Sequence, residues 1–131
     1  MMTITVYGIK NCNTMKKAFD KLNELGVAYE FFDYKKSVLD GKTFAEFIAK
    51  FGADKVVNKK GTTYRKFDDA TKALIDDAIG NPSDENIAKL YEIAKDNQSL
   101  LKRPIIIGEK KDGKAAVVIG FDDGEYQAVF G

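Results

Sequence analysis

The beginning of the chain carries a strand–helix–strand pattern, which constrains the fold more than any other feature of the sequence. Over residues 3–7 apolar side chains alternate with threonines, and Gly8 ends this run, as in a short strand. Over residues 15–25 apolar side chains recur at spacings of three and four, as in an amphipathic helix that stops at Gly26. A second strand is predicted over residues 28–33. Because such crossovers are right-handed, the two strands should be parallel, with the helix on one face.

The rest of the chain predicts helices followed by a hairpin. Apolar residues recur at helical spacing in three stretches: residues 44–51, about 70–79 and 82–94. Residues 104–107 and 115–119 are β-branched runs joined by an Asp-Gly turn, and a short helix follows from about Asp122. This order predicts an α/β chain with a thioredoxin-like fold, in which helices flank a four-stranded mixed sheet. A helical segment is inserted before the hairpin, over about residues 40–98.

Composition narrows the class of protein. A chain of 131 residues with 44% hydrophobic content can bury a core without disulfides, so we expect residues 1–131 to form a single domain. Its 21 basic and 20 acidic residues nearly cancel, which disfavours direct binding to nucleic acid or to an anionic membrane. No secretion signal is recognisable, and no stretch approaches the ~18 apolar residues of a membrane span. We therefore expect a cytoplasmic protein.

The chain has one cysteine and no histidine. A lone cysteine cannot form an internal disulfide, and zinc sites built from four Cys and His ligands are excluded. Catalysis by Ser-His-Asp or Cys-His groups is excluded as well. Any chemistry must therefore depend on the single thiol, Cys12, and we expect no metal site.

Cys12 lies in a polar loop at the start of the first predicted helix. Its neighbours Lys10, Asn11, Asn13 and Thr14 are candidates for binding a substrate or an anion. Helix N-termini and nearby cations lower the pKa of a thiol and so increase the thiolate population near neutral pH. The alternative is that Cys12 is an inert, buried core residue, as free cysteines often are. The polar neighbours favour the reactive interpretation.

Two further segments are candidates for anion binding. Arg103 precedes Pro104 at the start of a predicted strand, where an X-Pro bond can be cis, and its guanidinium suits oxyanions. The loop over residues 58–66 is basic and contains Lys60 and Arg65, which could hold a phosphate, arsenate or carboxylate group. For both segments the alternative is that the basic side chains are simply solvated. Neither a P-loop nor a Rossmann motif is present.

Four segments together resemble the arsenate reductase (ArsC)/Spx family, particularly its YffB-like branch. They are Val6 to Cys12, Asn58 to Arg65, Leu100 to Ile105, and Gly120-Phe121 with the closing helix. The resemblance implies that Cys12 attacks the substrate, that glutathione resolves the adduct and that glutaredoxin reduces the mixed species. It also implies that Arg103 binds the anion beside a cis proline, Pro104.

This chain departs from the arsenate reductases at two positions. Where they carry two further arginines, it has Asn58 and Gly120. The resemblance therefore favours a monothiol oxidoreductase that depends on glutathione over a reductase of arsenate itself. We expect no tightly bound cofactor, with glutathione as co-substrate and a glutaredoxin-type thiol as a further possible reductant.

The Spx members of the family suggest an alternative function. They regulate transcription by binding the RNA polymerase α subunit, and they use a Cys-x-x-Cys redox switch. Here Met15 takes the place of the second cysteine of that motif, so an internal switch cannot form. A non-catalytic, Spx-like module that binds the α subunit is the alternative hypothesis.

Overall fold

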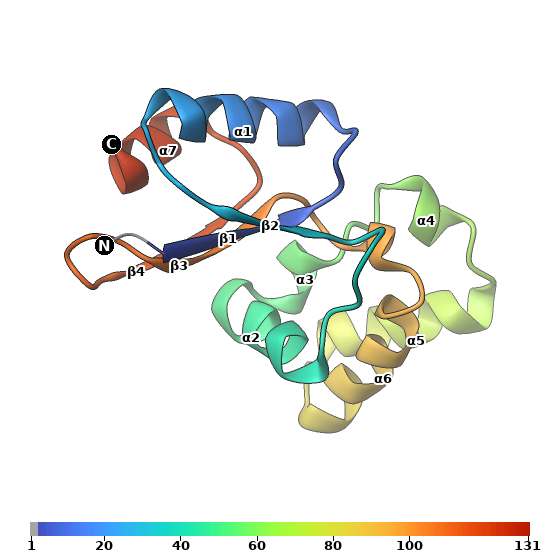
Figure 1. The fold of residues 1–131 in the computed structure, drawn as a ribbon. Coiled ribbons are helices and arrows are strands. Elements are labelled where there is room, and N and C mark those ends of the chain that lie inside the picture. The colour runs from blue at the N-terminus through green and yellow to red at the C-terminus, as the bar shows by residue number, and fades with distance from the viewer. Residues whose placement is uncertain (1–2) are drawn as a thin grey trace. The chain divides into compact units, whose positions relative to one another are not determined.

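The computed structural model describes residues 3–131, and the chain divides into two compact units. The sheet unit consists of residues 3–37 and 103–131, and the helical unit is Val38–Lys102. Figure 1 shows the course of the chain through both. The expectation that residues 1–131 form a single domain stays a prediction.

A four-stranded mixed sheet forms the centre of the sheet unit. Its strands are β1 Thr3–Gly8, β2 Glu30–Asp33, β3 Ile105–Glu109 and β4 Ala115–Ile119. Their order is β2-β1-β3-β4, with β1 and β2 parallel and the other two pairs antiparallel. The hairpin turn between β3 and β4 closes as the Asp-Gly signal predicted, with Lys110 N donating to Lys114 O at 2.8 Å. The thioredoxin-like α/β fold predicted from the sequence is confirmed.

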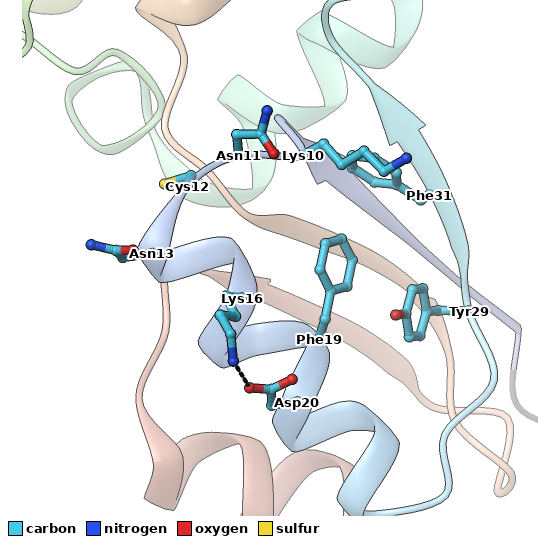
Figure 2. A pocket seen from close by; sticks show the side chains of 9 residues that line it. All are labelled: Lys10, Asn11, Cys12, Asn13, Lys16, Phe19, Asp20, Tyr29 and Phe31. Atoms are coloured by element: carbon cyan, nitrogen blue, oxygen red, sulfur yellow. Dashed lines mark hydrogen bonds and ion pairs between the residues drawn. The ribbon is translucent and has the colours of Figure 1, made fainter.

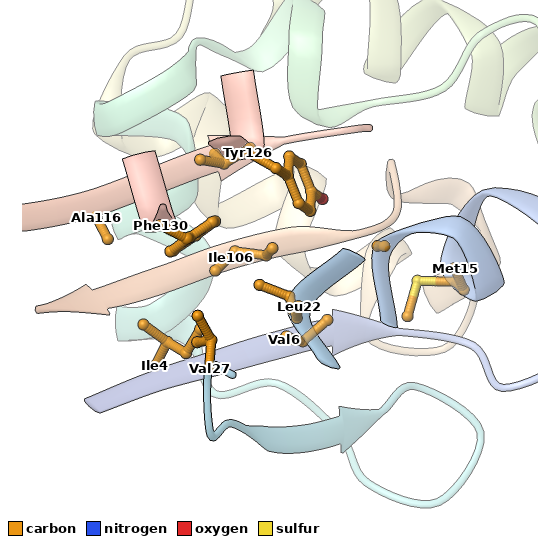
Figure 3. Close-up of a cluster of buried hydrophobic side chains, with 11 residues drawn as sticks. Ile4, Val6, Met15, Leu22, Val27, Ile106, Ala116, Tyr126 and Phe130 are labelled. Atoms are coloured by element: carbon orange, nitrogen blue, oxygen red, sulfur yellow. The ribbon is translucent and has the colours of Figure 1, made fainter. Parts of the chain in front are cut away.

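Helices α1 Asn13–Glu24 and α7 Asp123–Phe130 lie on the same face of this sheet (Figure 1). The apolar residues that alternate along β1 and recur along α1 meet on this face, together with side chains of β3, β4 and α7 (Figure 3). The cluster comprises Ile4, Val6, Met15, Ala18, Leu22, Val27, Ile106, Ala116, Val118, Tyr126 and Phe130. Burying each of its larger side chains contributes about 1.5–3 kcal/mol. This packing fixes α1, and with it the position of its first turn.

The helical unit contains more elements than the sequence predicted. They are α2 Gly41–Phe51, α3 Ala53–Val56, α4 Thr62–Arg65, α5 Asp69–Gly80, α6 Asp84–Ala94 and the short 3₁₀ helix η1 Gln98–Leu100. Asp40, Asp68 and Ser83 cap α2, α5 and α6 through their side chains. None of the helices within residues 3–131 combines the length and the hydrophobicity needed to cross a membrane.

The two ends of the helical unit are tied together. The buried side chain of Gln98 accepts a hydrogen bond from Leu39 N at 2.8 Å, and Tyr91 Oη donates to Leu39 O at 2.6 Å. An isolated antiparallel bridge pairs Val57 with Leu101. The bond between Leu39 and Gln98 thus connects the beginning of the unit to its end, and the other two contacts join its beginning to α6 and its middle to its end.

Three boundaries differ from the sequence-based expectations. Residues 58–66 were predicted as a loop, but they contain the one-turn helix α4. The second strand begins at Glu30 rather than at residue 28, and β3 begins one residue after Pro104. A helix of four residues is too short to show a period in its sequence, which explains why α3 and α4 were missed.

Gly108 lies where β3 passes β1, and we expect its replacement by alanine to disrupt the sheet. A Cβ atom there would lie 2.6 Å from Ile4 Cα and would also collide with Thr3 O. Because both are backbone atoms of the neighbouring strand, no side-chain rotation can relieve the overlap. Gly108→Ala should lower the free energy of unfolding by about 3 kcal/mol, measured by denaturant unfolding.

Gly80→Ala is the matched control, because a Cβ at Gly80 would meet no atom within 4 Å. Its free energy of unfolding should change by less than about 1 kcal/mol. Equal effects of the two substitutions would contradict the close approach at Gly108.

Candidate functional site around Cys12

Cys12 is the N-cap residue of α1, so the sequence correctly placed it where the first strand–helix connection ends. Its backbone is extended, with φ −141° and ψ 134°, and its carbonyl accepts the first helical hydrogen bond, from Lys16 N at 2.9 Å. The side chain is half-buried and packs against the edge of the core. Lys10, Asn11 and Asn13 beside it are exposed. The Cys12 side chain thus packs against the core while its thiol remains accessible.

The surroundings of Cys12 favour its thiolate. Partial burial raises the pKa of the thiol, but the backbone N–H groups of Met15 and Thr14, followed by the guanidinium of Arg103, lower it by more. The net result is a Cys12 pKa below its ordinary value. The structure shows no capping hydrogen bond from the Cys12 side chain. The two N–H groups lower the pKa by favouring the charged form, as expected at a helix N-terminus.

Arg103 belongs to the sheet unit and lies beside Cys12. It is half-buried, and the Arg103–Pro104 peptide bond is cis, as predicted. Two successive hydrogen bonds stabilise the Arg103–Pro104 turn. Gly120 N donates to Pro104 O at 2.8 Å, and the buried Tyr126 Oη donates to Gly120 O at 2.7 Å. Gly120 has a φ of +79°, a conformation that favours glycine. The core side chain of Tyr126 thereby supports the turn that carries Arg103.

Gly8 lets the two halves of the site approach each other, a role that the sequence analysis missed. A Cβ atom at Gly8 would lie 2.6 Å from Met15 Cε and 3.4 Å from Arg103 Cβ. Met15 is fully buried, so its side chain has little room to move away. The missing side chain at the end of β1 therefore allows the first turn of α1 and the Arg103 turn to pack closely.

Tyr34 is a second residue that the sequence analysis did not single out. It is buried, and its backbone N donates to Gly8 O at 2.8 Å. Burial, and secondarily Tyr7, raise the pKa of Tyr34 far above its usual range, whereas Arg103 acts in the opposite direction. The hydroxyl therefore stays neutral, and the charge of Arg103 acts on Tyr34 as well as on Cys12.

The basic segment lies in the helical unit, where part of its charge is already neutralised. Lys59 Nζ forms an ion pair with Asp76 at 2.8 Å, and Tyr64 Oη donates to the same carboxylate at 2.9 Å. Arg65 Nε donates to Gly61 O at 3.3 Å, but the side chain is exposed, as is that of Lys60. Participation of Lys60 and Arg65 at the site of Cys12 stays a prediction.

A pocket of about 670 Å³ adjoins the loop that carries Cys12. Figure 2 shows its lining, which comes from this loop, from α1 and from the chain around β2: Lys10, Asn11, Cys12, Asn13, Lys16, Phe19, Asp20, Tyr29 and Phe31. The sequence analysis placed Phe19 within the apolar spacing of the helix and did not predict its contacts with Tyr29 and Phe31. The alternation of Tyr29 and Phe31 could have indicated them, because it places both side chains on the α1 face of the sheet. Within residues 3–131 no three acidic or sulfur ligands lie close enough to hold a metal ion.

Comparison with known proteins identifies the family. The model of the ArsC family matches residues 7–129. The chain belongs to the ArsC family. It is 40% identical over 127 residues to an uncharacterized protein of Haemophilus influenzae, and the match covers 97% of this chain and 98% of that protein.

Solved structures of similar proteins agree with this membership. The structure of a protein named YFFB is 35% identical, covers 98% of this chain and 99% of its own, and superimposes with a TM-score of 0.77. The structure of an arsenate reductase (ArsC) related protein from Brucella melitensis is 36% identical, with coverages of 98% and 95% and a TM-score of 0.60. The ArsC family is a family of thiol-based reductases, and its fold is the one described above.

Proposed function

We propose that this ArsC-family chain is a monothiol oxidoreductase whose nucleophile is the Cys12 thiolate. The observation that carries the proposal is the environment of the sulfur, where two backbone N–H groups and the Arg103 guanidinium lower the pKa of a half-buried, accessible thiol. Such an environment characterises reactive cysteines and distinguishes them from structural ones. Family membership supports the same class of chemistry.

The proposed reaction is an exchange in two steps. The Cys12 thiolate attacks one sulfur of a disulfide substrate, the substrate S–S bond breaks, and the other half leaves as a thiolate. An external thiolate, for which we propose glutathione, then attacks the substrate sulfur of the mixed disulfide, forms a disulfide with that half of the substrate and releases the Cys12 thiolate. The external thiol is required because the chain has no second cysteine that could resolve the intermediate. Arg103 stabilises the negative charge on sulfur before the attack and again when Cys12 is the leaving group.

Turnover is the direct test of this function. The chain should reduce a small disulfide in the presence of glutathione, and the rate should depend on both thiol and disulfide. The alternative, a non-catalytic module that binds the RNA polymerase α subunit, predicts no turnover and retention of the chain on immobilised α subunit. Retention without turnover would therefore replace the proposed function with this alternative.

The pH dependence of Cys12 alkylation should reveal the lowered pKa. We expect the rate of reaction with iodoacetamide to increase with pH and then to level off. The midpoint of this increase should lie at a pKa below the ~8.5 of a free thiol. The sign follows from the net effect of Met15 N–H, Thr14 N–H and Arg103, which favour the charged form. In denaturant, where these contacts are lost, the midpoint should return to the pKa of a free thiol. Identical midpoints in the folded and unfolded chains would contradict an activated thiol.

A further inference from the structure

The pocket beside Cys12 has an aromatic wall that the reaction described above does not use. Phe19 stacks on Tyr29 with ring centroids 5.3 Å apart, and Phe31 meets Phe19 edge-on at 5.2 Å. All three rings are half-buried and pack on the core of the sheet unit, so their positions are fixed while part of each faces solvent. Concave sites with a rigid apolar lining and a few polar groups are typical of small-molecule binding.

The charges around this wall leave one cation without a counter-charge. Lys16 Nζ and Asp20 Oδ2 form an ion pair at 2.8 Å and neutralise each other. Lys10 is exposed and, among residues 3–131, has no acidic side chain within ion-pair distance. Apart from Cys12, whose thiolate is offset by Arg103, the lining therefore carries a net charge of about +1, which complements a ligand group with a single negative charge.

The lining also sets the shape of the ligand. Figure 2 shows Cys12 and Tyr29 at opposite ends of the lining, with Phe19 between them and the sulfur directed away from the rings. A ligand that reaches the sulfur and also covers the rings must therefore be elongated. We expect a short aliphatic disulfide to reach Cys12 with little contact to the aromatic wall.

From these features we infer that the pocket selects the substrate: a low-molecular-mass disulfide with an elongated half whose body is aromatic and carries one carboxylate. The body lies on Phe19, Tyr29 and Phe31, and the carboxylate pairs with Lys10. The Cys12 sulfur bonds to one sulfur of the disulfide, the S–S bond breaks, and its electron pair leaves with the other half as a thiolate. This inference rests on the proposed function, because it assumes that Cys12 exchanges with disulfides.

Three disulfides of graded chemistry test the inference: dithiobis(nitrobenzoate), which has an aromatic ring and a carboxylate on each half, neutral dithiodipyridine, and short, neutral hydroxyethyl disulfide. For each probe the rate constant of a variant is divided by that of the wild type. Phe19→Leu and Phe31→Leu should slow both aromatic probes by about five-fold and leave hydroxyethyl disulfide within about two-fold. Lys10→Gln should slow only the carboxylated probe, by about three-fold at low salt, and high salt should abolish the difference.

Matched controls lie outside the pocket: Phe51→Leu for the rings and Lys36→Gln for the cation, neither of which should alter any ratio. Equal losses with all three probes would show that the substitutions act on the thiolate or the fold, and unchanged ratios would show that the wall is not used. Either result overturns the inference.

Two further measurements separate the possible causes of failure. If wild-type Cys12 reacts with none of the disulfides faster than the thiolate of glutathione does, the proposed function itself fails. If the pocket variants do not fold, nitrobenzoate is titrated into Cys12→Ser. Amide NMR shifts must then concentrate around Phe19 and Phe31, and their absence overturns the inference.

Discussion

Replacing Cys12 with serine is expected to abolish disulfide reduction, with a loss of at least about a thousand-fold, while the chain remains folded. A serine hydroxyl is not ionised near neutral pH, and Met15 N–H, Thr14 N–H and Arg103 cannot lower its pKa far enough to change this. Serine is also a better N-cap residue than cysteine, because its oxygen accepts hydrogen bonds from the first turn. The free energy of unfolding should therefore be unchanged or up to about 1 kcal/mol higher.

Turnover with glutathione and thermal unfolding, measured on the same preparation, check both parts of this expectation. Residual turnover in Cys12→Ser would place the chemistry elsewhere in the chain. Loss of the folded state would instead support the view that Cys12 is a core residue, since its side chain does pack against the edge of the core.

The second large effect is expected at Arg103. Its guanidinium is one of the groups that lower the pKa of Cys12, so Arg103→Ala should raise that pKa and slow reaction with anionic oxidants by about 100-fold. Arg103→Lys should restore the charge but lose the planar, two-pronged geometry, and so recover only part of the rate. Alkylation measured against pH separates a change in thiolate population from a change in substrate contact.

Lys102→Ala is the matched control, because Lys102 is exposed and precedes Arg103 directly. Arg65→Ala should have a smaller effect than Arg103→Ala. If Arg103→Ala left thiol reactivity unchanged and Arg65→Ala removed it, the anion site would lie in the basic segment of the helical unit, and our assignment would be wrong.

The sequence predicted the sheet unit well because its signals are local. The alternation in β1, the helical spacing in α1 and the Asp-Gly turn each span only a few residues, and the handedness of crossovers supplies the rest. The helical unit was predicted less completely. The bridge between Val57 and Leu101 joins residues far apart in the chain, and neither α3 nor α4 is long enough to show a period.

The site was only partly predictable for a related reason. Cys12 and its neighbours are contiguous, and the proline after Arg103 marked a second segment of interest. The pairing of Lys59 with Asp76 and the support of Gly120 by Tyr126 depend on tertiary packing. The aromatic wall combines Phe19 of α1 with Phe31 of β2 and with Tyr29 just before that strand, so it becomes visible only once α1 lies on the sheet.

The tie between the ends of the helical unit has a consequence for folding kinetics. Thr3 of β1 pairs with Glu109 of β3, so nearly the whole chain separates these partners, and sheets with such high contact order form slowly. The helical unit occupies the larger part of this connection, and the bond between Leu39 N and Gln98 holds its two ends together. Once the unit has folded, the segment that must be closed entropically shrinks to residues 9–37, which include α1 and β2, and the Arg103–Pro104 turn. Local folding of the helices therefore lowers the barrier to pairing the two central strands, and through them to assembling Cys12 with Arg103.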